Sequence, residues 1–485
     1  MAFRSLGSTH AVCGFCQSTV VRDGESLKRI GKMADVFDDY SQLQLMVQGK
    51  YQKVNFVIIG RLQYTGDNGN WNEWLAALDD GSSASLSEDN GSFVWSRGQD
   101  NTRPLPTPDQ WRVGSTTAIN GKPYSVASVA EVSLVAAQGE LPKLPPLGQK
   151  FFVVELRSEQ GEVISVDYSA QPPALSAGKA INMEDLALTG LRDAQQQGGK
   201  QVKGLQFNCP NCGSTVDVLL ATSKSMTCKS CNSLIDLSQG IGGALKHAVQ
   251  DEPVKPLISL GSIGTLQGKN WQVVGFQHRM GYEPNDPDEG FGWEEYLLYN
   301  AKAGFIFLLD ATDGWSVVKP ATGAPVGKSG SSVSYLGTHY TLQTAYTAET
   351  GYAAGEFYWP VVRGQKTNNQ DYASGKSVLS REQLGKEITW SVGSKVDYTL
   401  VASAFKIKDN AQDFKRADAT PFAAAGGIGA IGWIIIVCIV LVVLVSITRC
   451  SPGSSCDPQT QNCSSSGART SGGSYGGYSG GGGHK

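Results

Sequence analysis

Four cysteines in the middle of the chain have the spacing of a metal site. They form two Cys-x-x-Cys pairs, Cys209 with Cys212 and Cys228 with Cys231, and fifteen residues separate the pairs. Each pair can direct two thiolates at one ion, and two pairs complete a tetrahedral four-cysteine site. Because four thiolates leave no open position for water, the spacing predicts a structural zinc ribbon, with zinc as the cofactor. A redox-active pair is the alternative, but a thioredoxin-type motif stands alone before a helix.

A third pair, Cys13 and Cys16, lies near the start of the chain without a second pair beside it. The text CGFCQSTVV matches CKSCNSLID around the second knuckle of the ribbon, so it reads as half of a ribbon whose first half is absent. A ligand set that adds His10 is open, although the repeat places Ser225 at the equivalent position. Because half a ribbon leaves two thiolates without a metal, we expect a start codon farther upstream, in a longer reading frame that encodes the missing Cys-x-x-Cys knuckle. Otherwise residues 1–20 are expected to be poorly ordered and free of zinc.

Acidic residues recur at matching places in two long segments, and they are candidates for binding or acid–base chemistry. The recurring acids are Glu73 and Glu295, Glu140 and Glu356, and Asp167 and Asp371. Carboxylates in a pocket can bind a divalent cation or a polyamine, or they can transfer protons. The structural alternative places the glutamates on strand faces, where they accept hydrogen bonds. A ligand site requires the four glutamates to converge in a pocket, whereas a scaffold leaves them scattered or bonded to the backbone.

No catalytic constellation accompanies these acids. The five histidines do not recur between the two segments, and the sequence contains no nucleophile elbow, phosphate-binding loop, zinc-protease helix or dinucleotide fingerprint. Lysine and arginine number 41 against 44 acidic residues, so no basic field attracts nucleic acid. The sequence therefore predicts neither an enzyme nor a nucleic-acid-binding protein.

One structural unit, present twice, must position these residues. The segment 49–64 aligns without gaps to 264–279, and the shared glycines, aromatics and alternating apolar residues indicate strands after tight turns. Helical segments are expected around 182–190 and 380–387. The predicted fold is mainly β, with two repeated small β-barrel or sandwich-like modules, a zinc ribbon and one C-terminal transmembrane helix.

A run of twenty uncharged residues at 428–447 is long enough to cross a bilayer as a helix. Three basic residues lie within twenty positions before this run, and only Arg449 lies that close after it. The positive-inside rule therefore favours a cytoplasmic N-terminal body, and the cysteine pairs of the body agree with a reducing compartment. The Gly/Ser-rich tail cannot bury enough apolar surface to fold.

The predicted order is half ribbon, module, ribbon, module, anchor and tail. The boundaries are 1–30 for a half zinc ribbon without its N-terminal knuckle, 40–195 for the first β-module, 205–238 for the zinc ribbon, 255–407 for the second β-module, 408–425 for a linker, 426–448 for the transmembrane helix, and 449–485 for a disordered Gly/Ser-rich tail.

The motifs IGKMADV, WNEW, WEEYLLYN and GEFYWPVVRG and the ending GGSYGGYSGGGGHK resemble those of a bacterial family that carries the domain of unknown function 4178. The resemblance covers essentially the full chain. It implies a membrane-associated bacterial protein with N-terminal zinc ribbons and no established reaction. Through gene neighbourhood it also implies a link to envelope-stress or polyamine-related systems. This chain departs from the family pattern in lacking the first knuckle.

These observations predict a membrane-anchored, non-enzymatic interaction or scaffold protein of the bacterial envelope. It is expected to span the inner (cytoplasmic) membrane once, with its N-terminal body in the cytoplasm and a short tail outside, and to contact protein partners at the membrane. The alternative is a carboxylate-lined binder of a polyamine or a divalent cation. The sequence leaves the partners, the pathway and the oligomeric state open.

Overall fold

Antiparallel strands dominate the part of the chain that the structure describes. The computed structural model describes residues 8–23, 26–33, 41–66, 69–89, 92–100, 104–192, 205–220, 223–238, 245–250, 253–284, 286–301, 303–329, 331–407 and 411–416. The high content of Val, Tyr, Trp and Thr in Gly-punctuated segments favours strands over helices. The mainly β fold predicted from the sequence is confirmed within these residues.

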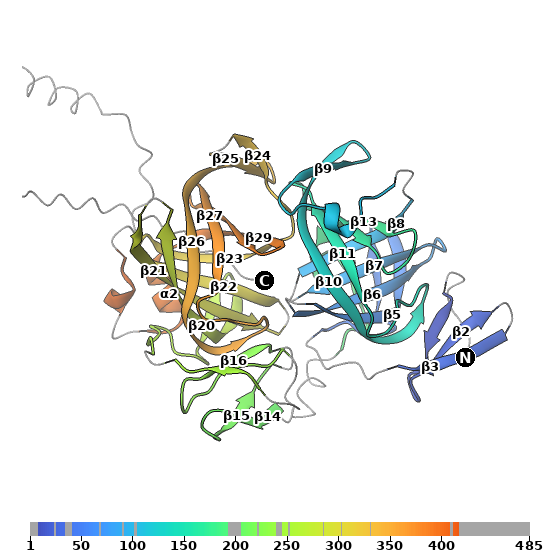
Figure 1. The fold of residues 1–485 in the computed structure, drawn as a ribbon, viewed down its shortest axis with the longest axis horizontal. Helices are drawn as coiled ribbons and strands as arrows, with labels where there is room; N and C mark the ends of the chain where they lie inside the picture. Colours follow the sequence, from blue (N-terminus) through green and yellow to red (C-terminus); the bar gives the residue numbers. More distant parts are fainter. Residues whose placement is uncertain are drawn as a thin grey trace, which may run out of the picture. The chain divides into compact units, whose positions relative to one another are not determined.

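The first module is a closed ring of eight antiparallel strands (Figure 1, blue to cyan). Pairing runs from β5 through β6, β7, β8, β13, β12, β11 and β10, and β10 pairs again with β5. The strands of the ring are β5 (Val54–Gly66), β6 (Gly69–Leu78), β7 (Ser83–Asp89), β8 (Ser92–Gln99), β10 (Lys122–Leu141), β11 (Lys150–Arg157), β12 (Glu162–Asp167) and β13 (Ala174–Ile181). Outside the ring lie β4 (Gln48–Tyr51), β9 (Thr116–Ile119) and the 3-10 turns η1 (Pro108–Gln110) and η2 (Met183–Leu186).

The second module repeats this ring with the same strand order (Figure 1, yellow to orange). In ring order its strands are β20 (Lys269–Glu283), β21 (Asp286–Asn300), β22 (Gly304–Ala311), β23 (Gly314–Ala321), β29 (Glu387–Val396), β28 (Ser377–Leu384), β27 (Lys366–Ser374) and β26 (Thr338–Phe357). Added elements are β19 (Ile263–Leu266), β24 (Val326–Ser329), β25 (Ser332–Tyr335), α2 (Tyr398–Ala404) and η3 (Ala411–Phe414). Phe56 pairs with Gly49, and Trp271 pairs with Gly264, on corresponding strands. The predicted internal repeat is therefore confirmed.

Two glycine pairs explain how each ring closes. Gly60 faces Gly139 in the first ring, and Gly275 faces Gly355 in the second. A Cβ on Gly139 would lie 2.2 Å from the carbonyl oxygen of Ile59, and Gly139 also has a left-handed φ of +72°. Because the two backbones approach this closely only without side chains, the recurring glycines are required where the first and last strands of the ring meet.

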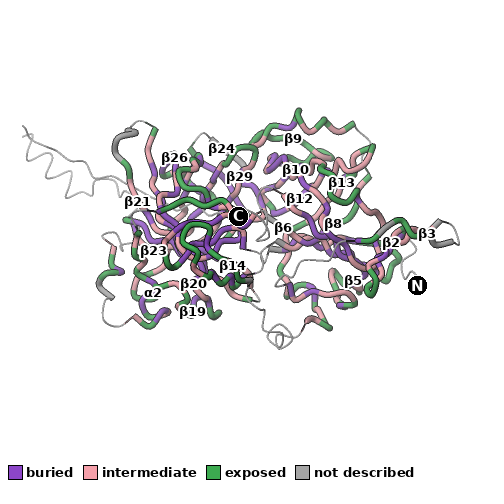
Figure 2. Tube along the Cα trace, turned by 60° about the horizontal axis from the view of Figure 1, so that its bottom comes forward, coloured by how far each residue is buried: buried purple, intermediate pink, exposed green. Residues whose placement is uncertain are grey.

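An apolar cluster packs against each ring, and Figure 2 shows buried residues along the strands of both modules. On the first ring, Phe56, Trp74 and Trp95 pack against chain segments that contribute Leu43 and Leu186. On the second ring, the short helix α2 contributes the buried residues Val401 and Ala402 to a cluster that contains Trp271 and Trp315. Each ring is consequently buried on its outside by added elements, and polar residues can occupy its interior.

The ribbon segments attach to equivalent strands of the two rings. The ribbon strands are β14 (Leu205–Asn208), β15 (Thr215–Val218), β16 (Ser225–Thr227), β17 (Leu234–Asp236) and β18 (His247–Ala248), and the N-terminal strands are β1 (His10–Val12), β2 (Ser18–Asp23) and β3 (Ser26–Lys32). Ser225 of β16 pairs with Phe357 of β26, and His10 of β1 pairs with Leu141 of β10. The predicted equivalence of His10 and Ser225 therefore holds in three dimensions.

One expectation about local structure is wrong, and another holds only in part. Residues 380–387 are not helical, because 377–384 form strand β28 and its alternating Val378, Ser380 and Glu382 point to one face of the ring. In the segment 182–190, only the 3-10 turn η2 is helical. The N-terminal half ribbon is also more regular than expected for an isolated half, since residues 8–23 form two strands and a turn.

No helix within the described residues has the length and apolarity to cross a membrane. The predicted transmembrane segment 426–448 and the tail 449–485 lie outside the described residues, as does most of the linker 408–425.

Candidate metal centre and ring interiors

Two tight turns bring the four cysteines of the ribbon together. The sulfur atoms of Cys209, Cys212, Cys228 and Cys231 all lie within 4.8 Å of one another. The Sγ atoms of Cys209 and Cys231 are 3.7 Å apart, as are those of Cys212 and Cys228. A tetrahedral ion with metal–sulfur bonds of about 2.3 Å separates its sulfurs by roughly 3.8 Å. The four cysteines are thus arranged to hold one metal ion.

The turns are built in the same way at each knuckle. The N–H groups of Cys209 and Cys228 donate to the carbonyls of Ser214 and Ser233 at 2.8 and 2.9 Å. The residue after each second cysteine has a left-handed backbone, with φ +74° at Gly213 and +55° at Asn232. A hydrogen bond with Ser233 lowers the pKa of Cys231 to about 6, whereas burial raises the pKa of Cys209 to about 12.

Cys13 and Cys16 adopt the same knuckle turn without a second pair. The N–H of Cys13 donates to the carbonyl of Ser18 at 3.0 Å, and Gln17 has a φ of +54°. Among the described residues no third cysteine, histidine or carboxylate joins these two sulfurs in a metal-binding group. His10 Nδ1 instead lies 2.7 Å from Thr9 Oγ1. The described residues therefore bring only two ligands together here.

Glu356 joins the ribbon to the second ring. Its buried carboxylate accepts hydrogen bonds from the N–H groups of Leu219 and Leu220 at 2.8 and 3.0 Å and from Ser223 Oγ at 2.8 Å. Burial raises the pKa of Glu356, while these donors act in the opposite direction. Glu140 occupies the equivalent place on β10, opposite Ala11 of β1. This pair of predicted ligand-binding residues thus lies at the ribbon attachments, and the four glutamates do not converge.

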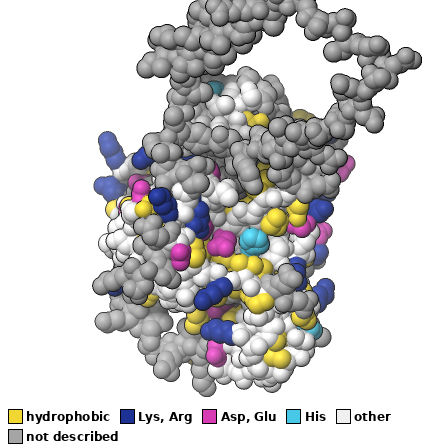
Figure 3. Space-filling model, turned by 90° about the vertical axis from the view of Figure 1, so that its left-hand side faces the viewer, with side chains coloured by type: hydrophobic (Ala, Val, Ile, Leu, Met, Phe, Trp, Pro, Cys, Tyr) yellow, Lys and Arg dark blue, Asp and Glu magenta, His cyan; other side chains and the backbone are white. Residues whose placement is uncertain are grey.

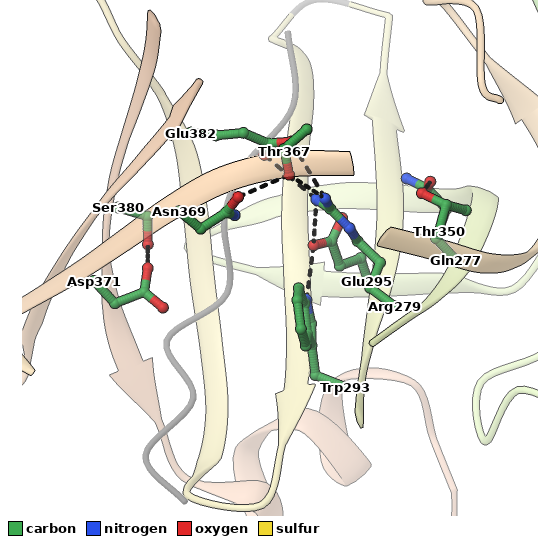
Figure 4. A network of polar contacts seen from close by, with 10 residues as sticks. All are labelled: Gln277, Arg279, Trp293, Glu295, Thr350, Thr367, Asn369, Asp371, Ser380 and Glu382. Carbon is green, nitrogen blue, oxygen red and sulfur yellow. Dashed lines mark hydrogen bonds and ion pairs between the residues drawn. The ribbon is translucent and has the colours of Figure 1, made fainter. Parts of the chain in front are cut away.

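Arg279 and three acidic side chains lie inside the second ring (Figure 4). The guanidinium of Arg279 lies 3.5 Å from the Glu295 carboxylate and donates to Glu382 at 3.3 Å and to Thr367 Oγ1 at 3.0 Å. Its carbon lies 5.4 Å from the centre of the Trp293 ring, whose Nε1 donates to Glu295 at 2.8 Å. The third acid, Asp371, accepts from Ser380 at 2.6 Å and is 2% exposed. Within the described residues, the interior of this ring holds a buried polar network around the Arg279 guanidinium, with the Asp371–Ser380 pair beside it.

Burial and charge pairing act against each other in this network. Burial lowers the pKa of Arg279, but the carboxylates of Glu382 and Glu295 outweigh it and raise the pKa above its usual value. Burial raises the pKa of Glu295 to about 7, against the attraction of Arg279. The arginine therefore stays charged, while Glu295 titrates near neutrality.

A cavity borders the inner face of the first ring, and Gln277, Thr350, Thr367 and Glu382 of the second ring also line it. On the first ring the lining includes the acids Glu73, Glu155 and Asp167, the basic residues Lys143 and Arg157, the aromatic residues Tyr64, Trp71 and Phe151, and the small or apolar residues Leu75, Ser83, Ser85, Ser87, Ser96, Ala130, Ser165 and Ser176. Glu73 keeps some accessible surface because it faces this space. Burial raises its pKa, a hydrogen bond with Ser85 lowers it, and the charge of Asp167 raises it further. Asp167 forms an ion pair with Lys143 at 3.3 Å.

Strand pairing identifies equivalent residues in the two interiors. Tyr64 pairs with Trp71 as Arg279 pairs with Trp293, so Tyr64 corresponds to Arg279. Asp167 pairs with Val153 of β11, and Glu382 pairs with Asn369 of β27, so Asp167 corresponds to Glu382. Asp371 corresponds instead to Glu155. Glu155 of β11 pairs with Ser128, and Asp371, at the equivalent position of β27, pairs with Thr344. The sequence pairing of Asp167 with Asp371 through the shared Asp-Tyr text is therefore wrong.

The sequence did not identify Arg279 and Glu382 as residues of the ring interior. Arg279 stands inside the aligned block 264–279, but its partner in the first copy is a tyrosine, so the repeat gave no sign of a shared charge. Glu382 fell within a segment expected to be helical, which obscured the alternation of its strand. An alternating register for 377–384 would have placed Glu382 on the inner face.

A family model described as "Domain of unknown function (DUF4178)" matches the chain twice, at residues 47–183 and 259–398. These ranges contain the two rings. No curated protein and no solved structure matches the chain.

Proposed function

Because this chain belongs to the DUF4178 family and carries its domain twice, we propose that it is a membrane-anchored, non-enzymatic binding protein in which one of the two domains receives a small ligand. The first ring is the receptor. The second ring and its ribbon form a rigid support. The observation that carries this proposal is the contrast in side-chain size at equivalent inner positions of β7 and β22, beside a cavity that the serines of β7 line.

The contrast follows from residue size at equivalent positions. On β7 the inner face carries Ser83, Ser85 and Ser87, and on β22 the same positions carry Phe305, Phe307 and Leu309. At other inner positions the sizes differ in both directions: Val318 and Tyr346 replace Ser96 and Ala130, whereas Thr367 and Ser316 replace Phe151 and Val94. Phe307 and Leu309 are 0 and 1% exposed. The bulkier side chains of β22 thus occupy space that the serines of β7 leave to the cavity.

Zinc in the ribbon completes the support. The sulfur separations of 3.7 Å fit a tetrahedral zinc ion. Metal binding supplies most of the folding free energy of so small a unit. Glu356 then couples the folded hairpin to β26 of the second ring through three hydrogen bonds.

The uncharged run at 428–447 supports a single-pass anchor in the inner membrane of a bacterium, with the rings in the cytoplasm and the tail outside. In this arrangement the protein reports ligand to partners at the membrane. The balanced charges of the chain agree with a protein partner more than with nucleic acid. On the face of the molecule in Figure 3, basic and acidic side chains are interspersed.

The test compares small molecules that purify with the full-length protein and with a Ser85→Phe variant. This variant gives the first ring the side chain that Phe307 supplies in the second, and it should exclude a ligand by volume. A Ser115→Phe variant makes the same change at an exposed turn of the same module. Mass spectrometry of the material released by denaturation should find a stoichiometric compound with the wild-type and Ser115→Phe proteins and none with Ser85→Phe. Equal release from all three proteins, or from none, refutes the proposal.

A further inference from the structure

The second ring indicates what the first ring binds. We propose, as a step that rests on the proposed function, that the first ring binds an organic cation through a guanidinium group, held by Glu73 and Asp167 beside Trp71. In the second ring the side chain of Arg279 occupies the corresponding place. The contacts of Arg279 in the second ring, called the reference complex below, therefore show how a guanidinium is bound at this place.

The reference complex defines the chemistry of the site. The Arg279 guanidinium contacts two carboxylates, one hydroxyl and one indole face: Glu295 at 3.5 Å, Glu382 at 3.3 Å, Thr367 at 3.0 Å and the centre of the Trp293 ring at 5.4 Å. A guanidinium is planar and presents several N–H donors, so two carboxylates and an aromatic ring together recognise it better than a compact ammonium. All of these groups are nearly completely buried.

The first ring keeps the recognising groups and lacks the arginine. Trp71 corresponds to Trp293, Glu73 to Glu295 and Asp167 to Glu382. Tyr64 stands at the arginine position and stacks on Trp71 at 5.3 Å between ring centres. Burial raises the pKa of Tyr64, and the charges of Glu73 and Asp167 raise it further. The tyrosine fills part of the space but supplies no positive charge.

The charge balance leaves room for one cation. Lys143 pairs with Asp167, but both side chains are partly exposed, at 42 and 30%. Among the described residues no cation lies within ion-pair distance of Glu73, and the charge of Lys143 acts on it from farther away. The serines of β7 provide the volume beside Glu73 that Phe307 and Leu309 take up in the second ring. A carboxylate enclosed in this way is stabilised by a positively charged ligand.

The experiment measures binding of N-butylguanidinium to the full-length protein by isothermal titration calorimetry. N-butylurea serves as the neutral probe of the same shape. The variants are Glu73→Gln, which removes one charge, and Tyr64→Arg, which recreates the internal cation of the second ring. Glu184→Gln is the matched control, because it makes the same change at an exposed position of the same module. Hydrogen exchange of the β5–β6 peptides verifies that each variant is folded.

The wild-type and Glu184→Gln proteins should bind N-butylguanidinium at least about tenfold more tightly than N-butylurea, because a charge-assisted pair is lost with the neutral probe. Glu73→Gln should weaken binding by about the same factor, and folded Tyr64→Arg should not bind. Equal affinity for the two probes, or an unchanged affinity of Glu73→Gln, overturns the inference. If neither probe binds while a compound still purifies with wild-type protein and not with Ser85→Phe, the inference fails and the proposed function stands.

Discussion

Removal of Arg279 provides the sharpest test of the polar network in the second ring. An Arg279→Met variant keeps much of the side-chain volume but leaves Glu295 and Glu382, which are 1 and 5% exposed, without their cation. Breaking a buried ion pair by deleting one partner typically destabilises by about 3–5 kcal/mol. At roughly 1.4 kcal/mol for each factor of ten, the opening equilibrium of the second ring should rise by about two to four decades.

Hydrogen exchange read by mass spectrometry separates this effect from the rest of the chain. Peptides from β20, β21, β27 and β28 should lose protection by this factor, while peptides from β5, β6, β11 and β12 of the first ring serve as an internal reference. The matched control is Arg97→Met, the same change at an exposed position of β8, for which less than about 0.5 kcal/mol is expected.

Two additions identify the cause of the loss. A compensated variant, Arg279→Met with Glu295→Gln and Glu382→Gln, should recover most of the protection, because no buried charge remains unpaired. The loss in Arg279→Met should also grow between pH 5 and pH 8. Without the arginine the pKa values of both carboxyls rise in the folded state, so their ionisation at higher pH opposes folding. A loss of equal size in the single and compensated variants, or at both pH values, would refute the charge-pairing account.

Four further predictions follow from specific contacts. Gly355→Ala places a methyl group 2.2 Å from the carbonyl oxygen of Val274, whereas Gly337→Ala meets open space at a similar φ of +78°. Gly355→Ala should therefore destabilise the second ring by well over the roughly 1 kcal/mol expected of Gly337→Ala. Equal losses of stability in urea titrations of the two variants would contradict the close-approach explanation. Metal analysis of the full-length protein should find about one zinc per chain. Cys228→Ser should lose this zinc together with the hydrogen-exchange protection of 205–238, and Cys13→Ser should keep the zinc. A Cys228→Ser protein that keeps its zinc and its protection would exclude the four-cysteine site. The pKa of Glu295 is about 7 against an ordinary 4.5, so the folded state holds the proton more tightly than the unfolded state. Wild-type stability should therefore fall as pH rises from about 4.5 to about 7, and Glu295→Gln should flatten this dependence. An unchanged pH profile of stability in Glu295→Gln would show that Glu295 does not titrate in this range. A membrane-impermeant thiol reagent on intact cells should label the cysteines of 450–485 and not Cys209, and labelling of Cys209 would reverse the topology.

Several features were readable from the sequence because they depend on local spacing. Cys209 and Cys212 need only one turn to direct two sulfurs at an ion, and the second pair repeats that turn. The repeated glycines and aromatics located the two rings, since Gly60 and Gly275 serve the same close contact in each. Patterns of this kind can be recognised in the sequence because they involve residues that are close in the chain or repeated from one unit to the next.

The contents of the ring interiors were decided by tertiary structure. Asp167 and Asp371 share an Asp-Tyr text but lie on different strands of their rings, and the register of β12 and β28 makes Glu382 the counterpart of Asp167. Arg279 meets Glu382 across 103 residues of chain. A shift of one residue in any strand would turn these side chains to the outer face.

By itself, then, the amino-acid sequence determined the repeat, the metal-binding turns and the uncharged run at 428–447, all through short-range spacing. Only the closed ring decided which acids share an interior and which of its positions carry small side chains. The physical reason is that an interior collects one face of eight strands. Its charge and volume therefore depend on every register at once, and a single substitution such as serine for Phe307 changes the available space without altering the β pattern.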